Sequence, residues 1–245
     1  MGLDQLEAAI ENFNRVIQIQ PDYADAYGNL GHALLRNGDL AAAIQNFSQA
    51  VKLDPNWILA HIILGNALQE SGDLTGAINS FEQAVKKSPG FAEAYINLGT
   101  ALQENGDLTA AIKNLRRALL LKPNFAEGHN NLGNVLRESG DLTAAIESYN
   151  QAVKINPNYA DGYSNLSNAL KDTEKIADAI SSFEKWLAID PKNSKFKSSM
   201  GSALIKSGNL NDGLRLQNSG SGVISYDLKT GVIIKFGASA WSASK

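Results

Sequence analysis

The chain has 245 residues, of which 44% are hydrophobic and 19% charged, and its formal net charge at pH 7 is −3. An acidic net charge argues against a nucleic-acid binder, which usually carries a basic stripe, and the absence of cysteine excludes disulfides and thiolate chemistry. No apolar run approaches the roughly 20 residues of a membrane-spanning helix, and the first residues show no signal-peptide pattern. We therefore expect a soluble, cytoplasmic protein that binds neither nucleic acid nor membrane.

The chain is periodic. Within each period, apolar residues recur at helical spacing in two sets, which predicts two amphipathic helices. A Gly-Asp pair such as Gly106-Asp107 separates the sets in most periods, because glycine suits the end of one helix and aspartate the N-cap of the next. One helix pair is too short to bury its own apolar face, but stacked pairs share a core. Six prolines mark the period of 34 residues: Pro21, Pro55, Pro89, Pro123, Pro157 and Pro191.

Taken in order, residues 3–23 match only the second helix of a repeat. The chain therefore begins either inside a longer array or with a capping helix. We expect the array to cover residues 3–210, with a last, partial repeat over 194–216. Between the half repeat and the partial repeat, five complete repeats are predicted at 24–57, 58–91, 92–125, 126–159 and 160–193.

The fifth repeat departs from the others. Ser167 replaces a glycine of the first helix, Trp186 replaces an alanine of the second, and Thr173-Glu174-Lys175 replaces the Gly-Asp turn. Because tryptophan needs far more room than alanine, we expect the packing of this repeat to differ.

Residues 217–245 do not continue the pattern. Residues 223–237 are rich in β-branched and aromatic residues, and Asp227–Gly231 suits a turn, so the sequence predicts a β-hairpin over 223–237. Three interpretations remain open for this tail: the start of a second domain, a non-native tail, or a strand pair that docks on the array or on a neighbour.

The repeated residues resemble the tetratricopeptide repeat, which has the same period. This resemblance implies an all-α fold: a right-handed superhelical solenoid of 34-residue helix-turn-helix repeats. It also implies that the first helices line a concave groove for peptides or partner proteins. In the third repeat the matching positions are Tyr95, Leu98, Gly99, Leu102, Ala111, Leu115, Ala118 and Pro123.

No set of residues suggests catalysis, so we expect neither enzyme activity nor a cofactor. His61 and His129 occupy the repeat position that holds Tyr27, Tyr95 and Tyr163 elsewhere, which favours packing over metal binding. They lie two repeats apart, and at roughly 8–10 Å per packed helix they are too far apart to share a metal ion.

The main functional prediction rests on two polar positions of the first helices, three residues apart. One position holds Asn97 and Asn131, and the other holds Asn66 and Asn134. Residues three apart share a helix face, so the two positions form one polar ladder along the array. The amides either bridge neighbouring helices or bind the main chain of an extended ligand, since an amide both donates and accepts. We favour the second interpretation. The predicted peptide-binding residues are Asn29, His32, Asn66, Asn97, Asn131, Asn134, Asn165 and Asn168.

This ladder is similar to the asparagine ladder of the O-linked N-acetylglucosamine transferase family, which implies that the amides hold peptide main chain with little sequence choice. In the second repeat, Leu59, Ile62 and Ile63 are either core residues or an apolar anchor for a bound side chain. Acidic residues recur at one position near the end of the first helices: Glu70, Glu104, Glu138 and Asp172. We interpret this series as a solvated helix edge rather than as a binding site for basic partners.

The sequence thus predicts a protein- or peptide-binding scaffold. A second interpretation is the substrate-presenting arm of a larger enzyme, such as a glycosyltransferase. A third is head-to-tail self-association, in which residues 194–206 of one molecule pair with residues 3–20 of the next, a contact that need not close.

Overall fold

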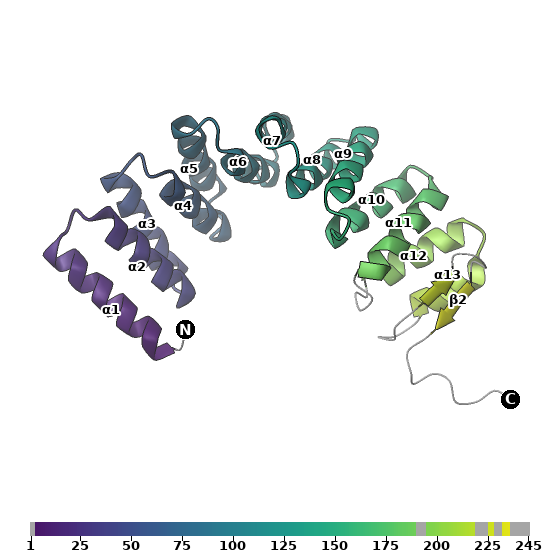
Figure 1. Cartoon of the computed structure of the whole chain (residues 1–245), viewed down its shortest axis with the longest axis horizontal. Helices are drawn as coiled ribbons and strands as arrows, with labels where there is room; N and C mark the ends of the chain where they lie inside the picture. The colour runs from purple at the N-terminus through teal and green to yellow at the C-terminus, as the bar shows by residue number, and fades with distance from the viewer. Residues whose placement is uncertain (1–2, 190–194, 219–224, 228–231, 236–245) are drawn as a thin grey trace. The chain divides into compact units, whose positions relative to one another are not determined.

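The computed structural model describes residues 3–189, 195–218, 225–227 and 232–235 (Figure 1). It divides into two compact units, a first unit over Met1–Pro123 and a second unit over Asn124–Lys245. The first unit contains α1 (Leu3–Ile19), α2 (Ala24–Arg36), α3 (Leu40–Leu53), α4 (Ile58–Glu70), α5 (Leu74–Lys87), α6 (Ala92–Glu104) and α7 (Leu108–Leu121). The second contains α8 (Ala126–Glu138), α9 (Leu142–Ile155), α10 (Ala160–Asp172), α11 (Ile176–Ile189), α12 (Lys195–Lys206), α13 (Leu210–Asn218), β1 (Ser225–Asp227) and β2 (Val232–Lys235).

Within each unit the helices pack in pairs, and each pair consists of the first and second helix of one repeat (Figure 1). The second helix of one repeat then packs on the first helix of the next, as α5 does on α6 and α9 on α10. The predicted all-α repeat architecture is therefore confirmed. None of the described helices combines the length and the apolar character needed to cross a bilayer.

The turn inside the first four complete repeats has the predicted chemistry. Gly106 has a positive φ of 84°, and the carboxylate of Asp107 accepts a hydrogen bond of 3.0 Å from the N–H of Ala110. The same glycine conformation and aspartate cap recur in the first, second and fourth complete repeats. In the fifth repeat Glu174 takes the place of the glycine and still has a φ of 62°. The turn geometry is thus retained there without glycine, at a backbone cost of about 1–2 kcal/mol.

In the first four complete repeats, the core includes a contact between a large side chain of the second helix and a glycine of the first. In the second repeat, a Cβ built on Gly65 would lie 2.5 Å from the ring of Phe81, which is 0% exposed. The absence of a side chain on the glycine therefore sets the distance between the two helices. Equivalent pairs are Gly31 with Phe47, Gly99 with Leu115, and Gly133 with Tyr149.

The fifth repeat is packed differently. Ser167 stands at the glycine position, is fully buried, and donates its hydroxyl to the carbonyl oxygen of Tyr163. Trp186 is buried as well, and its ring stacks on Phe183 with centroids 6.3 Å apart and an angle of 28° between the planes. The larger tryptophan is thus accommodated as part of an aromatic pair.

The two strands close the described part of the chain. β1 pairs antiparallel with β2, with Tyr226 opposite Ile233 and Asp227 opposite Val232. The residues between the strands, where the hairpin turn was predicted, lie outside the described part of the chain.

Candidate functional site

Asparagine side chains from the first helices of adjacent repeats meet in both units. In the first unit, the amide nitrogen of Asn97 on α6 lies 3.5 Å from the amide oxygen of Asn66 on α4. In the second unit, Asn165 on α10 donates a 2.9 Å hydrogen bond to Asn130 on α8. Asn130 was absent from the predicted set, because its repeat position holds glycine, isoleucine or serine in the other complete repeats.

Other members of the predicted set bond within their own repeat. The amide oxygen of Asn134 accepts a 2.8 Å hydrogen bond from the hydroxyl of Tyr149. The amide nitrogen of Asn168 donates at 3.0 Å to the carbonyl oxygen of Ser164, one turn earlier. His32 makes an edge-on ring contact with Phe47, with centroids 5.3 Å apart. These side chains are therefore partly committed to the fold.

Two asparagines of the set remain unpaired. Among the described residues, neither Asn29 on α2 nor Asn131 on α8 has a hydrogen-bond partner for its side chain; Asn29 is exposed and Asn131 half-buried. Asn97 uses only its nitrogen and Asn66 only its oxygen in their contact. The first helices therefore carry amide donors and acceptors that make no hydrogen bond within the described part of the protein.

The three residues predicted as an apolar anchor do not form one exposed patch. Ile62 is 9% exposed, and Ile63 packs against the cluster formed by Phe47, Leu64 and their neighbours. Leu59 is 55% exposed and stands apart as the accessible member of the three. Ile62 and Ile63 thus contribute to the core between repeats, and Leu59 alone offers apolar surface.

His61 takes over a structural contact made by tyrosine in the preceding repeat. The hydroxyl of Tyr27 donates to the carbonyl oxygen of Pro21 at 3.1 Å, and Nε2 of His61 lies 3.1 Å from the carbonyl oxygen of Pro55. Both contacts tie a first helix to the proline that precedes it. Within the described ranges, no group of three or more His, Cys, Asp or Glu side chains is placed to hold a metal ion.

The acidic edge is partly engaged by the fold. Gln69 donates a 2.7 Å hydrogen bond to the carboxylate of Glu104 in the next repeat, whereas Glu70 is exposed. Elsewhere in the first unit, Lys122 lies 2.7 Å from the carboxylate of Glu93. The hydrogen bond from Lys122 holds the pKa of Glu93 below its ordinary value.

Tyr149 links the buried core to Asn134 of the predicted polar ladder, and its ionisation can be tested by pH. Burial raises the pKa of Tyr149 to about 12 from an ordinary value of 10.0, partly offset by the positive charge of Arg137. Between these two values the unfolded chain releases the phenolic proton and the folded chain retains it, so stability falls as pH rises through this window. We expect the free energy of unfolding, measured by urea denaturation, to decline from pH 10 to about 12.

Tyr149→Phe serves as the control, because it leaves the ring in place and removes the titrating group. In this variant the decline should be smaller, although burial also raises the pKa of Tyr159 and leaves some dependence. If Tyr149→Phe lost as much stability between pH 10 and about 12 as the unsubstituted chain does, the raised pKa of Tyr149 would be contradicted.

Comparison with family models places most of the helical part in one family. A model described as "TPR repeat" matches residues 3–38 and 133–173. Models described as "Tetratricopeptide repeat" match residues 24–56, 68–133 and 160–193. No curated protein matches the chain.

Solved structures agree with the family models. MamA is 30% identical to this chain in sequence, and its crystal structure matches with a TM-score of 0.62. The match covers 68% of this chain and 97% of MamA. PilF of Pseudomonas aeruginosa is 19% identical with a TM-score of 0.68, and 79% and 88% of the two chains are covered. YrrB is 23% identical with a TM-score of 0.62, covering 82% of this chain and 100% of YrrB. Its helical period, its turns and these matches show that the chain belongs to the tetratricopeptide repeat family.

Proposed function

We propose that this chain is a protein- or peptide-binding scaffold that recognises an extended segment along the face of its first helices. The proposal rests on asparagine amides of the first helices that have no hydrogen-bond partner among the described residues, above all those of Asn29 and Asn131. The right-handed superhelix and concave groove of the family belong to this proposal. So does the likeness to the asparagine ladder of O-linked N-acetylglucosamine transferase.

The chemistry of an amide suits main-chain recognition. An extended peptide presents alternating N–H and C=O groups, and one asparagine can accept from the first and donate to the second. Asn66 and Asn97 lie on neighbouring first helices, so their remaining donor and acceptor lie side by side. A row of such groups binds backbone rather than side chains, which gives broad affinity with little sequence choice.

A solved relative supports a peptide as the ligand. YrrB is described as a tetratricopeptide protein with an unusual peptide-binding site. Its 23% identity is a likeness of fold, so the proposal here rests on the amides of this chain and takes only the class of ligand from that description.

The test starts from a random-peptide phage library selected on the full chain. A selected peptide is then synthesised, labelled with fluorescein and titrated by fluorescence anisotropy. Asn131→Ala should weaken binding by about three- to tenfold, because one hydrogen bond contributes about 0.5–1.5 kcal/mol. Methylation of the peptide's own backbone nitrogens should weaken it similarly, since the amides are proposed to hold main chain.

The matched control is Asn150→Ala, which removes an exposed asparagine from the second helix α9. It should leave affinity unchanged. The proposal fails if no peptide is enriched, or if Asn131→Ala binds the selected peptides as tightly as the unsubstituted chain does.

A further inference from the structure

The exposed side of α7 differs in charge from that of the other second helices. α7 carries Lys113, Arg116 and Arg117, all exposed. None of these three cations forms an ion pair with another residue in the described part of the chain. In the other complete repeats the same three positions hold at most one cation: Gln45, Ser48 and Gln49 in α3; Asn79, Glu82 and Gln83 in α5; Glu147, Asn150 and Gln151 in α9; Ser181, Glu184 and Lys185 in α11. The cluster is therefore a property of the third repeat and does not come from the repeat pattern.

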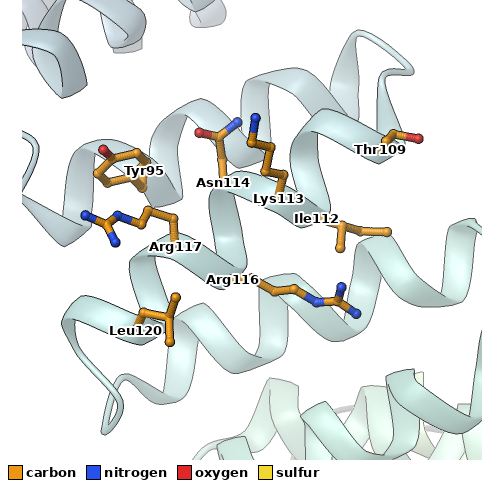
Figure 2. A pocket seen from close by; sticks show the side chains of 8 residues that line it. All are labelled: Tyr95, Thr109, Ile112, Lys113, Asn114, Arg116, Arg117 and Leu120. Atoms are coloured by element: carbon orange, nitrogen blue, oxygen red, sulfur yellow. The ribbon is translucent and has the colours of Figure 1, made fainter.

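The cations surround an open cavity with apolar walls. Figure 2 shows Lys113, Arg116 and Arg117 beside Ile112 and Leu120 of the same helix, with Tyr95 of α6 next to Arg117. The cavity has a volume of about 700 Å³. Leu120 is 74% exposed and takes the position that holds lysine in α3, α5 and α9. An exposed leucine thus stands where α3, α5 and α9 present a lysine, and three cations stand where those helices present neutral or acidic residues.

We propose that this face of α7, the basic α7 surface, binds an acidic segment of a partner protein that carries an apolar side chain beside its carboxylates. Arginine forks bind carboxylates in pairs of parallel hydrogen bonds, which gives both charge and geometric fit. Leu120, Ile112 and the ring of Tyr95 would cover the apolar side chain, and the volume suits a few side chains rather than a folded domain.

The mixture of charge and apolar surface favours a protein segment over other polyanions. A nucleic-acid site would need a basic stripe that follows a phosphate backbone, whereas this chain is acidic overall and the three cations stay on one helix. An anionic membrane surface is bound by clusters of about four to eight cations. Three cations around an apolar centre fit a short acidic peptide better than either.

The basic α7 surface lies on a second helix, whereas the proposed main-chain ladder lies on first helices. The inference therefore goes beyond the proposed function and can fail or hold independently of it. It gives the chain two surfaces with different preferences, one for main chain and one for negative charge.

The test uses the same random-peptide phage library, selected in parallel on the full chain and on Arg116→Glu/Arg117→Glu. We expect the unsubstituted chain to enrich peptides rich in Asp or Glu with Leu, Ile or Phe, and the variant to lose them. For one such peptide, labelled with fluorescein, reversal of the two charges should weaken binding by at least about tenfold. Its affinity should also fall as salt is raised, because salt screens exposed charges.

Three controls make the outcome decisive. Lys52→Glu/Lys86→Glu makes the same change in net charge at exposed sites of α3 and α5 and should leave the acidic peptide bound. Asn131→Ala should also leave it bound, which separates this surface from the ladder. A replacement of the peptide's glutamates by glutamine should abolish binding.

The inference is overturned if the selected peptides show no acidic preference, or if both charge-reversal variants weaken binding equally. It is also overturned if a dT oligonucleotide or a phosphatidylserine vesicle binds more tightly than the peptides and loses binding in Arg116→Glu/Arg117→Glu. Lys52, Lys86, Arg116 and Arg117 are exposed, and Asn131 is half-buried without a side-chain partner among the described residues. Thermal unfolding should therefore stay close to that of the unsubstituted chain, and it verifies that each variant folds.

Discussion

Replacing Phe81 with alanine should destabilise the first unit by about 3–5 kcal/mol, the usual cost of truncating a buried aromatic residue to alanine. Phe81 is fully buried, and its ring lies directly against Gly65 on the facing helix. No side chain on the glycine can move in to fill the space, so the cavity should persist. The free energy of unfolding from urea denaturation, followed by circular dichroism, gives the size of the effect.

The site of the loss can be checked as well as its size. In repeat proteins, stability is roughly the sum of contributions from each repeat and from contacts between neighbours. Hydrogen exchange should therefore accelerate most in α4 and α5. Leu59→Ala on α4 is the matched control: the side chain is about half exposed, and its truncation should cost less than about 1 kcal/mol. Equal losses in the two variants would contradict the assignment of Phe81 to the core.

The sequence alone was sufficient to predict the helices and their turns. The Gly106-Asp107 pair is a local signal: a left-handed residue and an N-cap act within a few residues, whatever surrounds them. The fifth repeat shows the limit of that signal. Glu174 adopts the left-handed conformation of the missing glycine, because the helices on either side still have to pack against each other.

The candidate site was less accessible from sequence, because a polar or apolar pattern does not reveal which neighbouring helix covers it. Ile62 illustrates this point: it stands at the same repeat position as Ile96 and Asn130, and all three are buried. The sequence gives no such indication, because the same position holds glycine in the first complete repeat and serine in the fifth. Asn130 was missed for the same reason, because one asparagine among isoleucine and glycine gives no recurring signal.

The asparagines of the predicted polar ladder show features that both of its interpretations expect. Asn97 with Asn66, and Asn165 with Asn130, bridge first helices, as the structural interpretation expects. Among the described residues, Asn29 and Asn131 have no such partner, as ligand binding requires. The basic α7 surface was not recognised from sequence, because it is a departure from the repeat. Periodic patterns show what the repeats share, and function that belongs to one repeat has to be found by the differences between them.

Replacing Gly133 with valine should destabilise the second unit by about 3 kcal/mol, through overpacking. A Cβ at Gly133 would lie 2.5 Å from the ring of Tyr149, which is fully buried and whose hydroxyl is held by Asn134. The ring is therefore fixed at both ends and cannot turn aside. Urea denaturation measures the loss, and Gly90→Ala, where a Cβ would have no neighbour within 4 Å, should be nearly neutral.

A double-mutant cycle separates this steric cost from any general intolerance of valine in α8. Tyr149→Ala opens a cavity directly over Gly133, so the added valine should fill part of it instead of clashing. In the Tyr149→Ala background, Gly133→Val should then cost much less than it does alone, a coupling of about 1–3 kcal/mol. Additive costs would mean that the two helices are not held apart by this pair, and that glycine stands at Gly133 for another reason. Because the same pairing recurs at Gly31, Gly65 and Gly99, this cycle tests the contact that sets the helix spacing in four repeats.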